Sequence, residues 1–98
     1  MRVTHASSKT ERLEREPAYT DGRPPDVVKA FRKRMQFLRA AKTEQDLRNW
    51  KALHFEKLKG QRKDERSVRL NDQWRLILKL EQATNGPQIV VVGITDYH

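Results

Sequence analysis

Three residues at the end of the sequence, Asp96, Tyr97 and His98, bring a carboxyl group, a phenol and an imidazole together. An imidazole transfers protons near neutral pH, and a phenol can stack on a nucleobase or act as a base beside cations. The carboxylate would orient the imidazole. Such a terminus alone is more often a solvated tail, because chain ends are usually loosely held. Its chemistry therefore depends on the groups that lie beside it.

Cations that could hold a phosphate precede this terminus. Six basic residues fall between positions 57 and 69, namely Lys57, Lys59, Arg62, Lys63, Arg66 and Arg69. Such a cluster can bind phosphates with release of counterions, although a solvated loop can have the same composition. Arg75 is different, because it lies within a predicted strand and faces away from Trp74. A guanidinium on a rigid strand can grip two phosphate oxygens at once.

These groups together are the parts of metal-free RNA scission. One group must take the proton of the 2′-hydroxyl, another must protonate the leaving 5′-oxygen, and cations must stabilise the phosphorane. The three histidines, His5, His54 and His98, do not have metal-ligand spacing, and the chain has no cysteine. We therefore expect no metal and no other cofactor.

Composition predicts a small, basic protein. Its 98 residues predict one domain, residues 1–98. With 21 Lys+Arg against 13 Asp+Glu the net charge is +8, which favours a polyanionic partner such as nucleic acid or an acidic protein. We expect no membrane partner and a cytoplasmic location, because neither a signal peptide nor a membrane span is visible.

The first half of the chain predicts a short strand and helices. The strand surrounds Val3, and a capping box starting at Ser8 predicts a helix to about residue 16. A longer helix begins at Pro25, and Thr43 would cap a short helix that ends near residue 50. The apolar stripe of the long helix has three- and four-residue spacing and contains Val27, Phe31, Met35, Leu38 and Ala41.

The second half predicts a three-stranded antiparallel meander. Alternation marks strands around residues 67–70 and 74–80, and Asn85-Gly86 predicts the hairpin turn between the second and third strands. Residues 89–94 are apolar on both faces, which is typical of a central strand. The sequence therefore predicts an α+β fold, with N-terminal helices packed on an antiparallel sheet that the N-terminal strand makes mixed.

Two stretches and the terminus resemble the HigB-type branch of the RelE/ParE toxin superfamily. The first stretch is Leu58-Lys59-Gly60, and the second, residues 67–75, reads SVRLNDQWR; Asp96-Tyr97-His98 closes the match. The similarity covers residues 54–98 well and implies a small RelE-like domain. It implies the toxin of a bacterial type II toxin–antitoxin pair, an endoribonuclease that cuts mRNA in the ribosomal A site without a metal.

The resemblance also implies roles for individual residues. Lys59 and Arg75 would hold and neutralise the scissile phosphate. Tyr97 and His98 would stack on the mRNA and serve as acid or base, supported by Asp96. RNA contacts would come from His54, Lys57, Arg62, Lys63, Arg66 and Arg69. The partner would be an antitoxin of the HigA type with a helix-turn-helix domain.

One position departs from the resemblance. HigB-type toxins often have a histidine three residues before the lysine of the LKG stretch, where this chain has Glu56. Either His54 serves from a shifted loop, or Glu56 is the base, or the site is weaker. Two other functions remain open: a gyrase-inhibiting toxin of the ParE kind, and a basic RNA-binding module without toxicity.

Overall fold

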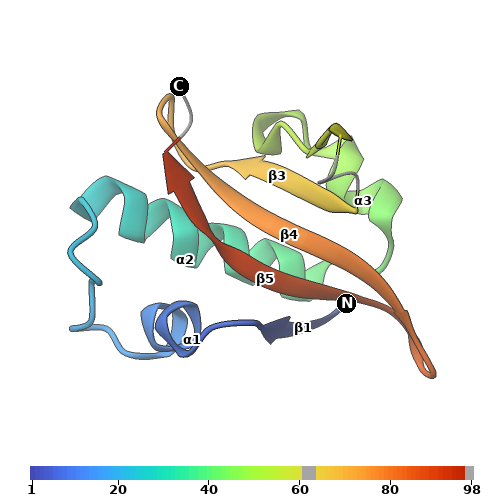
Figure 1. The fold of residues 1–98 in the computed structure, drawn as a ribbon, viewed down its shortest axis with the longest axis horizontal. Coiled ribbons are helices and arrows are strands. Elements are labelled where there is room, and N and C mark those ends of the chain that lie inside the picture. Colours follow the sequence, from blue (N-terminus) through green and yellow to red (C-terminus); the bar gives the residue numbers. More distant parts are fainter. Residues whose placement is uncertain (61–63, 97–98) are drawn as a thin grey trace.

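The computed structural model describes residues 1–60 and 64–96, so Arg62, Lys63, Tyr97 and His98 lie outside the described residues. Within this part the chain forms a mixed sheet covered by helices (Figure 1). The helical elements are α1 (Ser8–Arg15), α2 (Pro25–Ala40), α3 (Glu44–Asn49) and the 3-10 turn η1 (Lys51–Leu53). The strands are β1 (Arg2–His5), β2 (Glu56–Lys57), β3 (Glu65–Arg69), β4 (Trp74–Ala83) and β5 (Gly86–Asp96).

The five strands lie in the order β1-β5-β4-β3-β2. Strands β3, β4 and β5 form the predicted antiparallel meander, and β1 pairs with β5 in parallel, so the predicted α+β fold with a mixed sheet is confirmed. The apolar segment of residues 89–94 lies between two neighbours, as expected of an inner strand. The two-residue strand β2 at the far edge was not predicted, because its residues have no apolar pattern.

Helix α2 provides most of the helical side of the core. Its predicted stripe is buried, and Phe31, Met35 and Leu38 have no exposed surface. They pack against Leu76 and other apolar side chains of the sheet. The long helix lies behind the strands in Figure 1, and it ends where Ala41 turns into extended backbone. The 3.6-residue period was therefore a sufficient signal for this element.

The short helices depend on their caps. Ser7 is the N-cap of α1, and its hydroxyl accepts from the amide of Lys9, so the capping residue precedes the predicted one, Ser8, by one position. Thr43 caps α3 as predicted, in a reciprocal capping box with Asp46. Backbone N–H groups of residues 42 and 43 donate to the Asp46 carboxylate and lower its pKa. The box compensates for the shortness of the helix.

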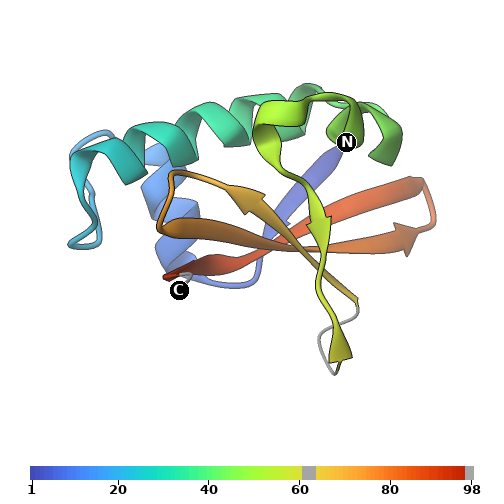
Figure 2. The same cartoon turned by 90° about the horizontal axis from the view of Figure 1, so that it is seen from above.

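The sheet has one helical face and one face without a described helix. Val68, Leu76 and Ile94 lie side by side across three strands and pack into the core with α2. Their neighbours along each strand point to the opposite side, because side chains alternate. Figure 2 shows the helices on one side of the strands only. The other side is called the open face below.

Candidate RNA-binding site on the open face

Two arginines lie directly opposite each other on the open face. Arg69 of β3 pairs with Arg75 of β4, and Arg75 pairs in turn with Thr95 of β5. Side chains opposite each other in an antiparallel pair are about 5 Å apart at Cβ, and like charges there destabilise the sheet. The alternation predicted that Arg75 would face away from Trp74. Its alignment with Arg69 depends on the register and concentrates positive charge at one end of the sheet.

The turn between β3 and β4 fixes the position of Arg75. The side-chain oxygen of Asn71 accepts from the amides of Gln73 (2.9 Å) and Trp74 (2.7 Å), and its amide donates to Asp26 at the start of α2. Arg75 Nη1 donates to the carbonyl oxygen of Asn71 at 2.7 Å. The turn at Asn71-Asp72 thus holds the arginine, since asparagine satisfies turn backbone groups.

Two titratable residues of the preceding segment lie on the same side. His54 is exposed, and its Nε2 is 3.5 Å from Arg69 Nη1. Glu56 pairs with Ser67, the residue two positions before Arg69, so its side chain also points to the open face. Arg69 and Arg75 together are called the arginine row below. His54 therefore lies at the arginine row, and Glu56 lies at the next row of the open face. Both candidates left open by the sequence are close to the arginines.

The row next to the two arginines on the open face is buried. Ser67 and Ile77 form the next row of the open face, and they are only 2% and 4% exposed. Ile77 does not belong to the core cluster that packs under α2. Neighbouring low-dielectric surface strengthens an ion pair made above it. An anion at the arginine row would therefore be bound more strongly than on a fully hydrated surface.

The remaining predicted cations are dispersed. Lys57 pairs with Arg66, and both side chains point away from the open face, on the side of Val68. Lys59 is exposed and follows β2; residues 58–60 extend out on the open side of the sheet (Figure 2). The amide of Leu58 donates to the Glu65 carbonyl, four residues along β3 from Arg69, which places this segment about 13 Å from the arginine row.

Asp96 lies at the end of β5, opposite Trp74. Its Oδ2 accepts from Gln73 Nε2 at 3.0 Å, so the carboxylate is held beside the β3–β4 turn. Trp74 is half-buried against the core, with the Arg23 guanidinium 5.2 Å from its ring centre. The last described residue thus lies at the arginine end of the sheet.

Sequence reasoning missed Arg34, which supports the site from the helical side. Arg34 Nε donates to the carbonyl oxygen of Arg69 at 3.1 Å, and its guanidinium lies 4.9 Å from the Trp50 ring centre. Burial, and then the charge of Arg69, lower the pKa of Arg34. Arg34 adds a third guanidinium near the same strand end.

Comparisons with known proteins agree with this fold. The family model described as the HigB-like toxin, a RelE-like toxin of type II toxin–antitoxin systems, matches residues 7–98. The solved structure of a YoeB/ParE toxin from Agrobacterium tumefaciens covers 100% of both chains with a TM-score of 0.59 at 13% sequence identity, which supports the fold. No curated protein matches the chain in sequence.

The match has consequences for the kind of partner. A type II toxin has a cognate antitoxin, and RelE-like toxins generally act as ribonucleases. No helix of the described residues is long and apolar enough to cross a membrane. The family model spans nearly the whole sequence and includes the arginine row. The chain belongs to the HigB-like family of RelE-like toxins of type II toxin–antitoxin systems.

Proposed function

We propose that the chain, as one toxin domain of residues 1–98, is a metal-independent endoribonuclease that cuts mRNA on the ribosome. The observation that carries this proposal is the cross-strand pair of Arg69 and Arg75 on the open face. Like charges held opposite each other weaken a sheet. Asp72 already pairs with Arg69. A phosphodiester, the anion that the family membership suggests, would be a second anion for the two guanidinium groups.

The arginines would act on the scissile phosphate. Arg75 is held at its turn by a hydrogen bond to the Asn71 carbonyl, so little reorganisation is needed when charge develops on the phosphorane. Lys59 would reach a flanking phosphate from the segment after β2. Lys57 and Arg66, together with Arg62 and Lys63, would contact RNA outside the cleaved bond.

The base that takes the 2′-hydroxyl proton would be Glu56 or His54. Both lie beside the arginine row, and Glu56 is exposed on the open face. We propose Glu56 for this role, with His98 as the acid for the leaving 5′-oxygen. Tyr97 would stack on the RNA, and Asp96 would orient His98.

The test is expression of wild-type and variant toxins followed by sequencing of RNA ends. Arg75→Gln removes the charge but keeps a donor for the Asn71 carbonyl. Arg2→Gln is the matched control, because Arg2 is exposed on the same face and pairs with Gln88, which pairs with Glu81. That row is six residues along β4 from Arg75, or about 20 Å.

Wild-type and Arg2→Gln proteins should produce new RNA ends inside translated frames, whereas Arg75→Gln should not. The expected loss of cleavage is about 100-fold or more, the usual effect of removing one preorganised donor from a developing oxyanion. Ends that persist with Arg75→Gln would contradict the proposed site. Arrested gyrase complexes without RNA cuts would instead indicate a ParE-like poison, and unaffected growth would indicate a plain RNA-binding module.

A further inference from the structure

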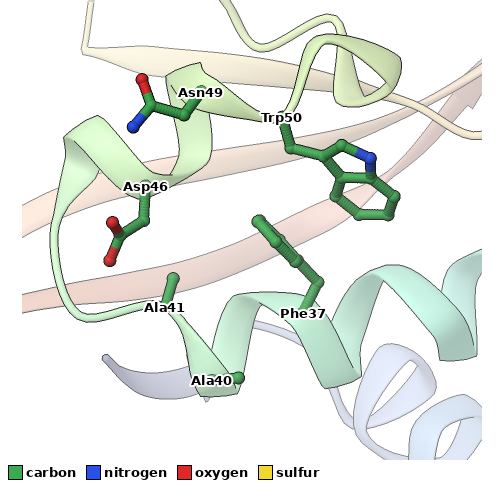
Figure 3. A pocket seen from close by; sticks show the side chains of 6 residues that line it. All are labelled: Phe37, Ala40, Ala41, Asp46, Asn49 and Trp50. Atoms are coloured by element: carbon green, nitrogen blue, oxygen red, sulfur yellow. The ribbon is translucent and has the colours of Figure 1, made fainter.

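A shallow groove of about 480 Å³ lies in the helical layer, apart from the open face of the sheet. It separates the C-terminal end of α2 from α3 (Figure 3). Its lining is mainly apolar and includes two aromatic rings. The lining residues are Phe37, Ala40, Ala41, Asp46, Asn49 and Trp50.

The aromatic pair in this groove is only partly covered. The ring centres of Phe37 and Trp50 are 4.4 Å apart with planes inclined by 47°, and both residues are half-buried. Ala40, the last residue of α2, is exposed beside them. Large aromatics at the edge of a pocket, with small residues next to them, accept an apolar side chain from another protein and let its backbone approach.

Cationic residues neighbour the groove in sequence or in space, whereas the one charged residue that lines it is Asp46. Lys33, one turn before Phe37, and Lys51, directly after Trp50, are exposed. The Arg34 guanidinium lies over the Trp50 ring. The carboxylate of Asp46 accepts hydrogen bonds from the backbone amides of residues 42 and 43. These two amides therefore engage its negative charge just before α3. A mainly apolar groove with basic neighbours complements an amphipathic segment that carries acidic side chains.

We propose that this groove docks the cognate antitoxin, through an acidic amphipathic helix. One apolar side chain of that helix would enter between Phe37 and Trp50, and its carboxylates would lie near Lys33 and Lys51. A groove between two helices can bind a third, amphipathic helix, because the apolar side chains of that helix recur every three or four residues along one face. The partner follows from family membership, and the proposal does not depend on RNA cleavage.

The position of the groove has a functional consequence. Arg69 and Arg75 belong to the open face, whereas the groove is lined by residues of α2, α3 and the positions next to them. Both helices lie on the other side of the strands (Figure 2). A helix docked here alone would leave the arginine row uncovered. The docked helix would therefore contribute affinity for the toxin. Any blocking of the RNA site would come from another part of the antitoxin, or from exclusion of the toxin from the ribosome.

The test is calorimetric titration of the purified toxin with the purified antitoxin encoded beside it. Ala40→Glu places a carboxylate in the groove at an exposed position, and Ala18→Glu is the matched control in the exposed loop before α2. Lys33→Glu reverses one neighbouring charge without touching the groove lining. Thermal unfolding of each variant shows that the fold is kept, and light scattering reports the oligomeric state.

Ala40→Glu should weaken antitoxin binding by about 30-fold or more, as for an interface hot spot. Lys33→Glu should weaken it by a smaller factor that shrinks at high salt, since exposed charges are screened. Ala18→Glu should bind like the wild type. Unchanged binding by Ala40→Glu, or equal losses in both alanine variants, would overturn the proposal. So would a groove variant that alters only self-association or only RNA binding.

Discussion

If the arginine row binds phosphates, its two charges set part of the salt dependence of RNA affinity. Each phosphate neutralised on a single strand adds about 0.7 to the slope of log affinity against log salt concentration. Arg69 and Arg75 occupy one row, so each can neutralise a phosphate of the same bound strand. Removing both charges should lower the slope by about 1.4. When salt rises from 50 to 200 mM, the wild type should therefore lose about sevenfold more RNA affinity than the double variant.

The assay is fluorescence anisotropy with a short 2′-O-methyl RNA, which binds but lacks the attacking hydroxyl. The variants are Arg69→Gln with Arg75→Gln, and Arg2→Gln as the control on the same face. The double variant should show the shallower slope, and the control should keep that of the wild type within about 0.7, the contribution of one contact. Equal slopes in the double variant and the wild type would refute the assignment of the row to phosphate binding.

Three further predictions concern the fold that supports the site. Arg39, and to a lesser extent His5, hydrogen-bond Glu14 and hold its pKa below the usual 4.5 despite partial burial, so its stabilisation is present above pH 4.5 and is lost as pH falls through the depressed pKa. Glu14→Gln should cost about 2 kcal/mol at pH 7 and much less at pH 2.5 in urea unfolding; equal costs at both pH values would contradict this. Thr43→Ala should cost about 1 kcal/mol by loss of the capping box, measured in the same assay, and no change would refute the role of the cap. Phe31→Ala should cost about 3–5 kcal/mol and lower the melting temperature in calorimetry, because the ring is fully buried; a loss under about 1 kcal/mol would place it outside the core.

Much of the fold could be predicted because its elements repeat with a clear period. Phe31, Met35 and Leu38 recur at helical spacing, and all three are fully buried on α2. Trp74 and Leu76 share the core-facing side of β4, as alternation predicted. These signals are local, since burial of one face is sufficient to produce them.

Features that depend on long-range register could not be predicted. The strand β2 consists of Glu56 and Lys57, two charged residues with no apolar partner, and it exists because β3 offers a free edge. The alignment of Arg69 with Arg75 follows from the length of the turn at Asn71, and a shift of one residue would place one of them on the other face.

The candidate site combines both kinds of information. Arg75 could be singled out from the sequence, because a charged residue alternates there with core positions. Arg34 could not, since only the tertiary structure places its guanidinium against the carbonyl oxygen of Arg69. The groove beside Trp50 also escaped prediction, because an aromatic residue with a packing role and one that lines a surface groove look alike in sequence.

The most direct test of the proposed chemistry is cleavage of mRNA on programmed ribosomes, with one 2′-hydroxyl removed at the cut position. We expect the wild type and Arg2→Gln to cut the unmodified mRNA and to leave a 2′,3′-cyclic phosphate. The 2′-deoxy mRNA should stay intact, and Arg75→Gln should cut about 100-fold more slowly. Cutting of the 2′-deoxy mRNA at the normal rate would contradict attack by the RNA's own hydroxyl.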